Sequence, residues 1–112
     1  MPYIPQQGDI IYLDFDPQTG HEQRGRRPAL VVSNFTYNKI TRMALVCPIT
    51  NTDRNFPLHV GLKNRTQTTG FIKCEQVKAL DIVIRNASFH EKAPDDIVQE
   101  VFDILYGIIE IE

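Results

Sequence analysis

Short apolar runs, each too short for a stable amphipathic helix, occupy most of this chain. Residues 8–15 follow a two-residue period, which predicts a strand with Ile11, Leu13 and Phe15 on one face. Residues rich in Gly, Pro, Asn and Asp separate the runs and predict turns. Further strands are predicted at residues 28–33, 43–50, 57–62, 69–73, 77–80 and 83–89, with 57–62 and 69–73 forming a hairpin.

Two residues mark local features within this pattern. Pro48 lies inside a predicted strand and lacks a backbone N–H, so it must occupy a sheet edge, a bulge or a strand end. Asn34 follows the second run, and its side chain is suited to cap a helical turn that extends through Asn38.

The C-terminal residues change to a helical period. Apolar side chains between residues 97 and 108 recur at spacings of one and three, which predicts an amphipathic helix. Pro94 suits the first helical position, and Asp95 and Asp96 favour the positive end of the helix dipole. Short strands followed by one helix predict a mainly β fold with an α element: a strongly bent sheet or small barrel whose opening the helix covers.

Length and composition indicate one domain that spans residues 1–112. No apolar run approaches the ~18 residues of a membrane span, and the N-terminus lacks a signal-peptide pattern, so we expect a cytoplasmic protein without membrane contact. Cys47 and Cys74 show no metal-ligand spacing, and we expect two reduced, buried thiols and no metal site.

Charge is distributed unevenly along the chain. The formal net charge is −2, yet residues 1–90 carry eleven Lys and Arg against seven Asp and Glu. Residues 91–112 carry one Lys against seven Asp and Glu. The acidity is therefore local to the C-terminal segment, and the basic body remains compatible with a polyanionic partner.

The densest polar cluster is the loop at residues 20–28. It combines the imidazole of His21, the carboxylate of Glu22 and three arginines. Guanidinium groups match phosphate oxygens, while His and Glu supply acid and base groups, so the loop is suited to hold a phosphodiester and move protons on it. The alternative is a solvated loop whose arginines aid solubility.

Two other groups lie at predicted strand ends. Thr50 offers a hydroxyl to a phosphate oxygen, or closes its strand with a local turn. Near Lys73, Gln76 is suited to read a base edge, and Glu75 either acts as a base or forms a surface ion pair with Lys73. We interpret His59 and His90 as structural. Motifs of nucleotide hydrolases, dinucleotide enzymes, zinc peptidases and serine hydrolases are absent from the sequence.

Six segments together resemble the MazF/PemK/Kid family of toxin endoribonucleases, in order and spacing over nearly the whole chain. The resemblance implies a small SH3-like β-barrel with a C-terminal helix, a homodimer, and metal-independent, cofactor-free cleavage of single-stranded RNA. It also implies a cognate antitoxin whose acidic segment covers the RNA groove. The segments are Gly8-Asp9-Ile10, Asp16-Pro17, Gly20-His21-Glu22-Gln23, Arg27-Pro28-Ala29-Leu30-Val31-Val32-Ser33, Pro48-Ile49-Thr50 and Glu75-Gln76-Val77.

The resemblance also implies roles for individual residues. Arg27 matches the family's catalytic arginine, Thr50 its phosphate-contacting threonine, and Glu22 a loop carboxylate. His21 matches the histidine of the Kid-like branch, whose later arginine and aspartate are replaced here by lysine and glutamate. We expect the catalytic set to be Arg27, Thr50, Glu22 and His21, and the RNA-binding set to be Gln23, Arg24, Arg26, Lys73, Glu75 and Gln76.

The chemistry expected of such a site uses the RNA's own 2′-hydroxyl as nucleophile. We expect Glu22 or His21 to act as base and Arg27 to stabilise charge, because an arginine pKa above about 12 makes it a poor proton donor. Two other functions are compatible with the resemblance: a non-enzymatic DNA gyrase poison with the same fold, and an inactive RNA-binding module. The gyrase poison is disfavoured by the loop residues and by a helix whose apolar stripe we expect to be used up in packing.

Overall fold

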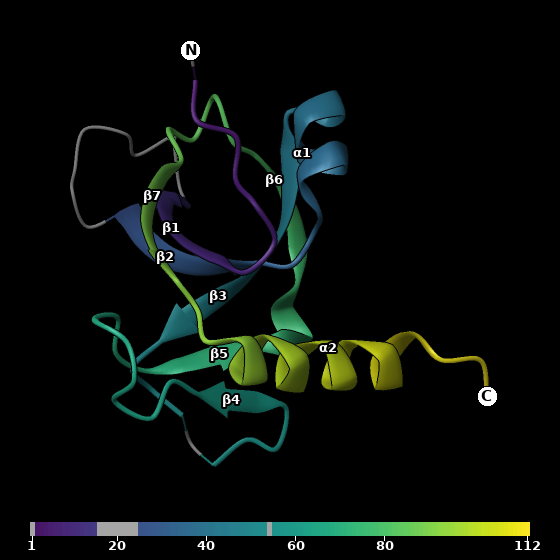
Figure 1. The fold of residues 1–112 in the computed structure, drawn as a ribbon. Helices are drawn as coiled ribbons and strands as arrows, with labels where there is room; N and C mark the ends of the chain where they lie inside the picture. Colours follow the sequence, from purple (N-terminus) through teal and green to yellow (C-terminus); the bar gives the residue numbers. More distant parts are fainter. Residues whose placement is uncertain (1, 16–24, 54) are drawn as a thin grey trace.

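The computed structural model describes residues 2–15, 25–53 and 55–112. Seven antiparallel strands form one bent sheet in the order β4-β5-β3-β2-β1-β7, and β6 pairs with part of β3 (Figure 1). The elements are β1 (Asp9–Asp14), β2 (Arg26–Val31), α1 (Phe35–Thr41), β3 (Met43–Thr50), β4 (His59–Gly61), β5 (Phe71–Lys73), the 3₁₀ helix η2 (Cys74–Gln76), β6 (Lys78–Asp81), β7 (Ser88–Lys92) and α2 (Asp95–Ile109).

The predicted mainly β fold with a C-terminal helix is confirmed. The sheet bends strongly, but the ladders over the described residues do not close into a barrel, because β4 and β7 remain its two ends. Strand β3 changes partner along one edge, from β6 at Val46 to β5 at Ile49. Pro48 lies between those two ladders, where its missing N–H removes no pairing on that edge.

Each face of the sheet packs on its own hydrophobic core. Residues of even number on β2 and odd number on β3, such as Leu30 and Ile49, face the core that α2 covers. Their neighbours, such as Val31 and Val46, face a second core beneath the N-terminal segment. Both faces of β1 are therefore buried, with Ile10 in one core and Ile11 and Leu13 in the other.

The two cysteines are free and buried, as predicted. Burial raises the pKa of Cys47 to about 12 and that of Cys74 to about 11, from an ordinary value of 9.0. Both thiols therefore stay protonated at neutral pH and contribute to the core as small apolar side chains.

Helix boundaries follow the local signals closely. Asn34 caps α1, and its side chain accepts a hydrogen bond from the Tyr37 backbone N–H at 2.9 Å. Helix α2 begins one residue later than predicted, because Pro94 is its N-cap rather than its first helical residue. None of the helices in the described parts of the chain is long and apolar enough to cross a membrane.

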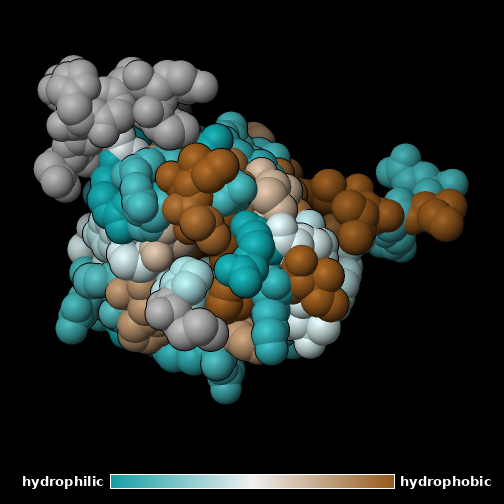
Figure 2. Space-filling view, turned by 90° about the horizontal axis from the view of Figure 1, so that it is seen from above, coloured by the Kyte–Doolittle hydropathy of each residue, from teal (hydrophilic) through white to brown (hydrophobic). Residues whose placement is uncertain are grey.

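The strand predicted at residues 83–89 was wrong in its first part, which is a turn through residue 86 followed by β7, and Val83 and Ile84 are exposed there. The predicted apolar stripe of α2 packs against the core as far as Leu105, but its last member, Ile108, is 46% exposed. Two apolar residues beside the stripe, Tyr106 and Ile109, are 63% and 74% exposed. Figure 2 shows hydrophobic side chains gathered at the projecting C-terminal end of the molecule.

Candidate functional site

Alternation along four strands places polar residues on the sheet face opposite to α2. In the β4–β5 ladder His59 pairs with Lys73, and residues paired in this way point to the same side. In the β2–β3 ladder Ala29 pairs with Pro48, so two further steps bring Arg27 opposite Thr50. The intervening positions, Ile49 and Ile72, point into the core.

A cavity of about 200 Å³ opens between these strands. Three cationic side chains line it, those of Arg27, Lys73 and Lys78, and no carboxylate is among its described lining residues. The Lys78 ammonium lies 5.4 Å from the centroid of the Phe15 ring, a cation–π distance. The remaining lining residues are Pro48, Ile49, Thr50 and Gln76. A cavity with this lining attracts an anion such as a phosphate.

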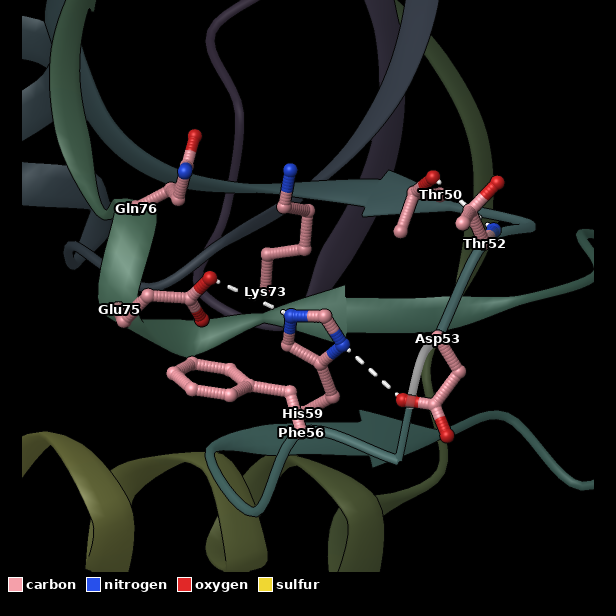
Figure 3. A pocket seen from close by; sticks show the side chains of 8 residues that line it. All are labelled: Thr50, Thr52, Asp53, Phe56, His59, Lys73, Glu75 and Gln76. Atoms are coloured by element: carbon pink, nitrogen blue, oxygen red, sulfur yellow. Dashed lines mark hydrogen bonds and ion pairs between the residues drawn. The ribbon is translucent and has the colours of Figure 1, made fainter.

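A second cavity, of about 420 Å³, adjoins the first and shares Thr50, Lys73 and Gln76 with it. In Figure 3 these three side chains lie on one side of the cavity, across from Phe56 and His59. The full lining is Thr50, Thr52, Asp53, Phe56, His59, Lys73, Glu75 and Gln76. The two cavities thus place cations next to carboxylates and an imidazole.

A row of three titratable side chains crosses the larger cavity (Figure 3). His59 Nδ1 lies 3.0 Å from Asp53 Oδ1, and His59 Nε2 lies 3.3 Å from Glu75 Oε2. The His59 side chain is only 7% exposed, and the ring of Phe56 packs edge-on against it at 5.2 Å between centroids. No group of three His, Cys, Asp or Glu side chains in the described residues is arranged to hold a metal ion.

The hydroxyl of Thr50 is oriented by its own turn. Its Oγ1 accepts a hydrogen bond from the Thr52 backbone N–H at 3.1 Å. Because the oxygen accepts there, its proton remains free to donate into the shared part of the two cavities. The local turn and the phosphate contact that the sequence left as alternatives are therefore compatible with each other.

The two neighbouring arginines of β2 lie in different environments. Arg27 is exposed and lines the cationic cavity. Arg26, on the opposite face, donates to Asp14 Oδ1 at 3.1 Å, to the Asn86 carbonyl at 2.7 Å and to Ser88 Oγ at 2.8 Å. Arg26 is therefore part of the framework that ties β2 to β1 and β7, and it lies outside both cavities.

The structure gives His59 and Glu75 partners that the sequence did not indicate. His59, interpreted as structural from the sequence, belongs to the larger cavity, and the available signal was its place in the predicted hairpin opposite Lys73. Among the described residues Glu75 pairs with His59, whereas the expected ion pair with Lys73 is not formed. The predicted residues His21, Glu22, Gln23 and Arg24 lie outside the described residues.

Comparison with known proteins shows the family to which this chain belongs. A family model described as "PemK-like, MazF-like toxin of type II toxin-antitoxin system" matches residues 6–109. The chain belongs to this PemK-like toxin family. It is 34% identical over 108 residues to endoribonuclease PemK of Escherichia coli, covering 93% of this chain and 81% of that protein. It is 41% identical over 86 residues to endoribonuclease toxin MazF of Escherichia coli K12, covering 77% of each.

Solved structures of the PemK-like family agree with the fold described above. MazF from Deinococcus radiodurans superimposes with a TM-score of 0.86 at 36% identity, covering 97% of this chain and 99% of that chain. A MazE–MazF structure from the same organism gives a TM-score of 0.86 at 30% identity, covering 98% and 99%. The bent sheet and C-terminal helix are thus the family's fold in this chain.

Proposed function

We propose that this PemK-like toxin is an endoribonuclease that cleaves single-stranded RNA, mRNA in particular, at short sequences in the cytoplasm, without metal or cofactor. One observation carries the proposal: the cationic cavity with Arg27, Lys73 and Lys78 shares a wall with a cavity that holds carboxylates and an imidazole. Cleavage of an RNA phosphodiester is accelerated by groups that stabilise the developing charge and by groups that transfer protons, and the shared wall brings both kinds together. The relatives described above, endoribonuclease PemK and endoribonuclease toxin MazF, support the same activity.

The proposed cleavage step takes its nucleophile from the RNA itself. The O2′ of one nucleotide forms a bond to the adjacent phosphorus, and the bond from phosphorus to the next O5′ breaks. A base takes the 2′-hydroxyl proton, and the leaving O5′ takes one proton from solvent or from an acidic group of the site, which gives a 2′,3′-cyclic phosphate and a 5′-hydroxyl. One water can then hydrolyse the cyclic phosphate to a 3′-phosphate. Three side chains are candidate bases: Glu22 and His21 from the predicted loop, and Glu75, which lines the larger cavity together with the shared residues Lys73 and Gln76.

Arg27 and Thr50 contribute to the transition state in this proposal. The Arg27 guanidinium stabilises charge that develops on the phosphorane, and the Thr50 hydroxyl donates to a nonbridging oxygen. Lys73 adds charge at the wall that both cavities share. Gln76 is exposed at the same wall, and its amide is suited to a base edge that single-stranded RNA leaves unpaired.

We also propose an antitoxin partner with an acidic segment, since the cationic cavity that receives RNA phosphates is suited to carboxylates as well. The solved MazE–MazF complexes from Deinococcus radiodurans support an antitoxin partner. An acidic peptide from such a partner should compete with RNA in a fluorescence polarisation assay, and competition should weaken as salt rises.

A homodimer is the proposed state of the toxin. An apolar groove of about 360 Å³ lies between α2 and the sheet, lined in part by Leu45, Val77, Phe102 and Tyr106. Large apolar surfaces of this kind mark interaction sites, and a second copy would cover the exposed end of α2. Light scattering should give twice 12.9 kDa for the wild type. Tyr106→Glu should shift the mass toward one chain, and a wild-type mass of 12.9 kDa at every concentration would contradict the proposal.

The central test is incubation of the purified protein with a labelled single-stranded RNA. We expect discrete fragments with 5′-hydroxyl ends, identified because a kinase labels them without prior phosphatase treatment. A matched RNA with one 2′-deoxynucleotide at the mapped cleavage position should stay intact. Cleavage of the deoxy substrate would rule out the 2′-hydroxyl mechanism, and absence of any cleavage would overturn the proposed function.

A further inference from the structure

We propose that His59 is a positioning residue for Glu75, held in place in turn by Asp53. This inference rests on the proposed function and adds to it a residue that was interpreted as structural from the sequence. Its basis is the row Asp53–His59–Glu75, in which both ring nitrogens of a nearly buried imidazole face carboxylate oxygens.

The three members of the row come from three separate elements. Asp53 lies in the loop after β3, His59 begins β4 and Glu75 lies in η2 directly after β5. His59 thus links the loop after β3 to η2 through one contact at each ring nitrogen, in a row that crosses the larger cavity (Figure 3).

Glu75 depends on this link for its orientation. One carboxylate oxygen, Oε2, contacts His59 at 3.3 Å, whereas the other, Oε1, is buried and has no hydrogen-bond partner among the described residues. A carboxylate anchored at a single oxygen loses its defined rotamer when the anchor is removed. His59 therefore sets where Glu75 presents its charge to the wall formed by Thr50, Lys73 and Gln76.

The position of His59 is itself well determined. Phe56 packs against the ring, and backbone pairing fixes His59 opposite Lys73. Asp53 restrains Nδ1, so rotation of the ring about its side-chain bonds would break a contact at either end. This inference assigns the base to Glu75: the 2′-hydroxyl proton passes to the Glu75 carboxylate, and His59 acts only by holding that carboxylate in position.

A double-mutant cycle separates this role from a structural one. Single-turnover cleavage at saturating RNA should fall about ten- to a hundredfold in His59→Ala, because an error of ~1 Å in the position of a reacting group can cost about 10²-fold. His59→Gln should recover most of the rate, since the amide nitrogen can still donate to Glu75. Binding of the 2′-deoxy RNA should be unchanged in both variants.

The decisive comparison is His59→Ala in a Glu75→Gln background. If His59 acts through Glu75, the double variant is no slower than Glu75→Gln alone. The inference would be overturned if the cleavage rate of the double variant fell by the product of the two single-variant losses. His90→Ala is the matched control, because His90 also contacts a glutamate, Glu91 at 3.7 Å, and an aromatic ring, yet lies outside both cavities.

The Asp53→Ala variant and the activity of the wild-type protein distinguish the remaining outcomes. If His59→Ala unfolds, Asp53→Ala can replace it, because this variant releases the other end of the row. Asp53→Ala should lower the cleavage rate by a smaller factor, and it should cause no further loss in the Glu75→Gln background. If the wild-type protein cleaves RNA and His59→Ala cleaves it at the same rate, the positioning role alone is refuted. A wild-type protein that cleaves no RNA would refute the proposed function and this role with it.

Discussion

The adjacent arginines of β2 should respond to alanine substitution in opposite ways. Arg27 lines the cationic cavity, whereas Arg26 forms three hydrogen bonds that tie β2 to Asp14, Asn86 and Ser88. Arg27→Ala should therefore reduce cleavage and leave stability nearly unchanged. Arg26→Ala should reduce stability and leave cleavage by the folded protein nearly unchanged.

The magnitudes follow from these contacts. Removal of a group that stabilises charge in the transition state costs about 10²-fold or more in turnover, so Arg27→Ala should slow single-turnover cleavage by at least about that factor. Each hydrogen bond of Arg26 contributes about 1 kcal/mol, and the partly exposed site reduces the sum to about 1–3 kcal/mol. At about 4 °C per kcal/mol, the melting temperature of Arg26→Ala should fall by about 4–12 °C.

Both variants can be measured on one RNA substrate and by one thermal melt. Cleavage should be followed well below the melting temperature of Arg26→Ala, so that folding does not limit its rate. The reasoning would be refuted if Arg27→Ala cut RNA at the wild-type rate, or if Arg26→Ala lost cleavage while it kept the wild-type melting temperature. Either result would move the site to the other face of β2.

Three other outcomes are expected. Excess EDTA should leave the cleavage rate unchanged, and loss of activity that Mg²⁺ restores would contradict the 2′-hydroxyl mechanism. If Arg27, Lys73 and Lys78 neutralise three phosphates, log affinity for 2′-deoxy RNA should fall with log salt at a slope of about −2, and Lys78→Ala should make that slope shallower by about 0.7. Burial raises the pKa of Glu91, but hydrogen bonds from Thr68 and Gln67 outweigh burial and hold it below 4.5. Glu91→Gln should therefore be less stable than wild type in urea unfolding above pH 4.5. This stability gap should close as pH falls through the lowered pKa, and a gap that stayed constant down to pH 2 would contradict the assignment.

Local patterns in the sequence determined most of the secondary structure. Alternation predicted β1, and the strand predicted at residues 43–50 matches β3, because a two-residue period is visible wherever a strand buries its faces. The helical stripe predicted α2, and Asn34 predicted the start of α1. These features depend on neighbours within a few positions, so a single sequence contains them.

The site depended on pairing between distant segments. Arg27 and Thr50 were predicted individually, but the β2–β3 register is what places them opposite each other on the face away from α2. His59 was missed because its partners, Asp53 and Glu75, come from a loop and a 3₁₀ helix that only the folded β4–β5 hairpin brings together. Strand register and loop placement are set by packing of the whole chain, and a one-residue shift would turn each of these side chains to the other face.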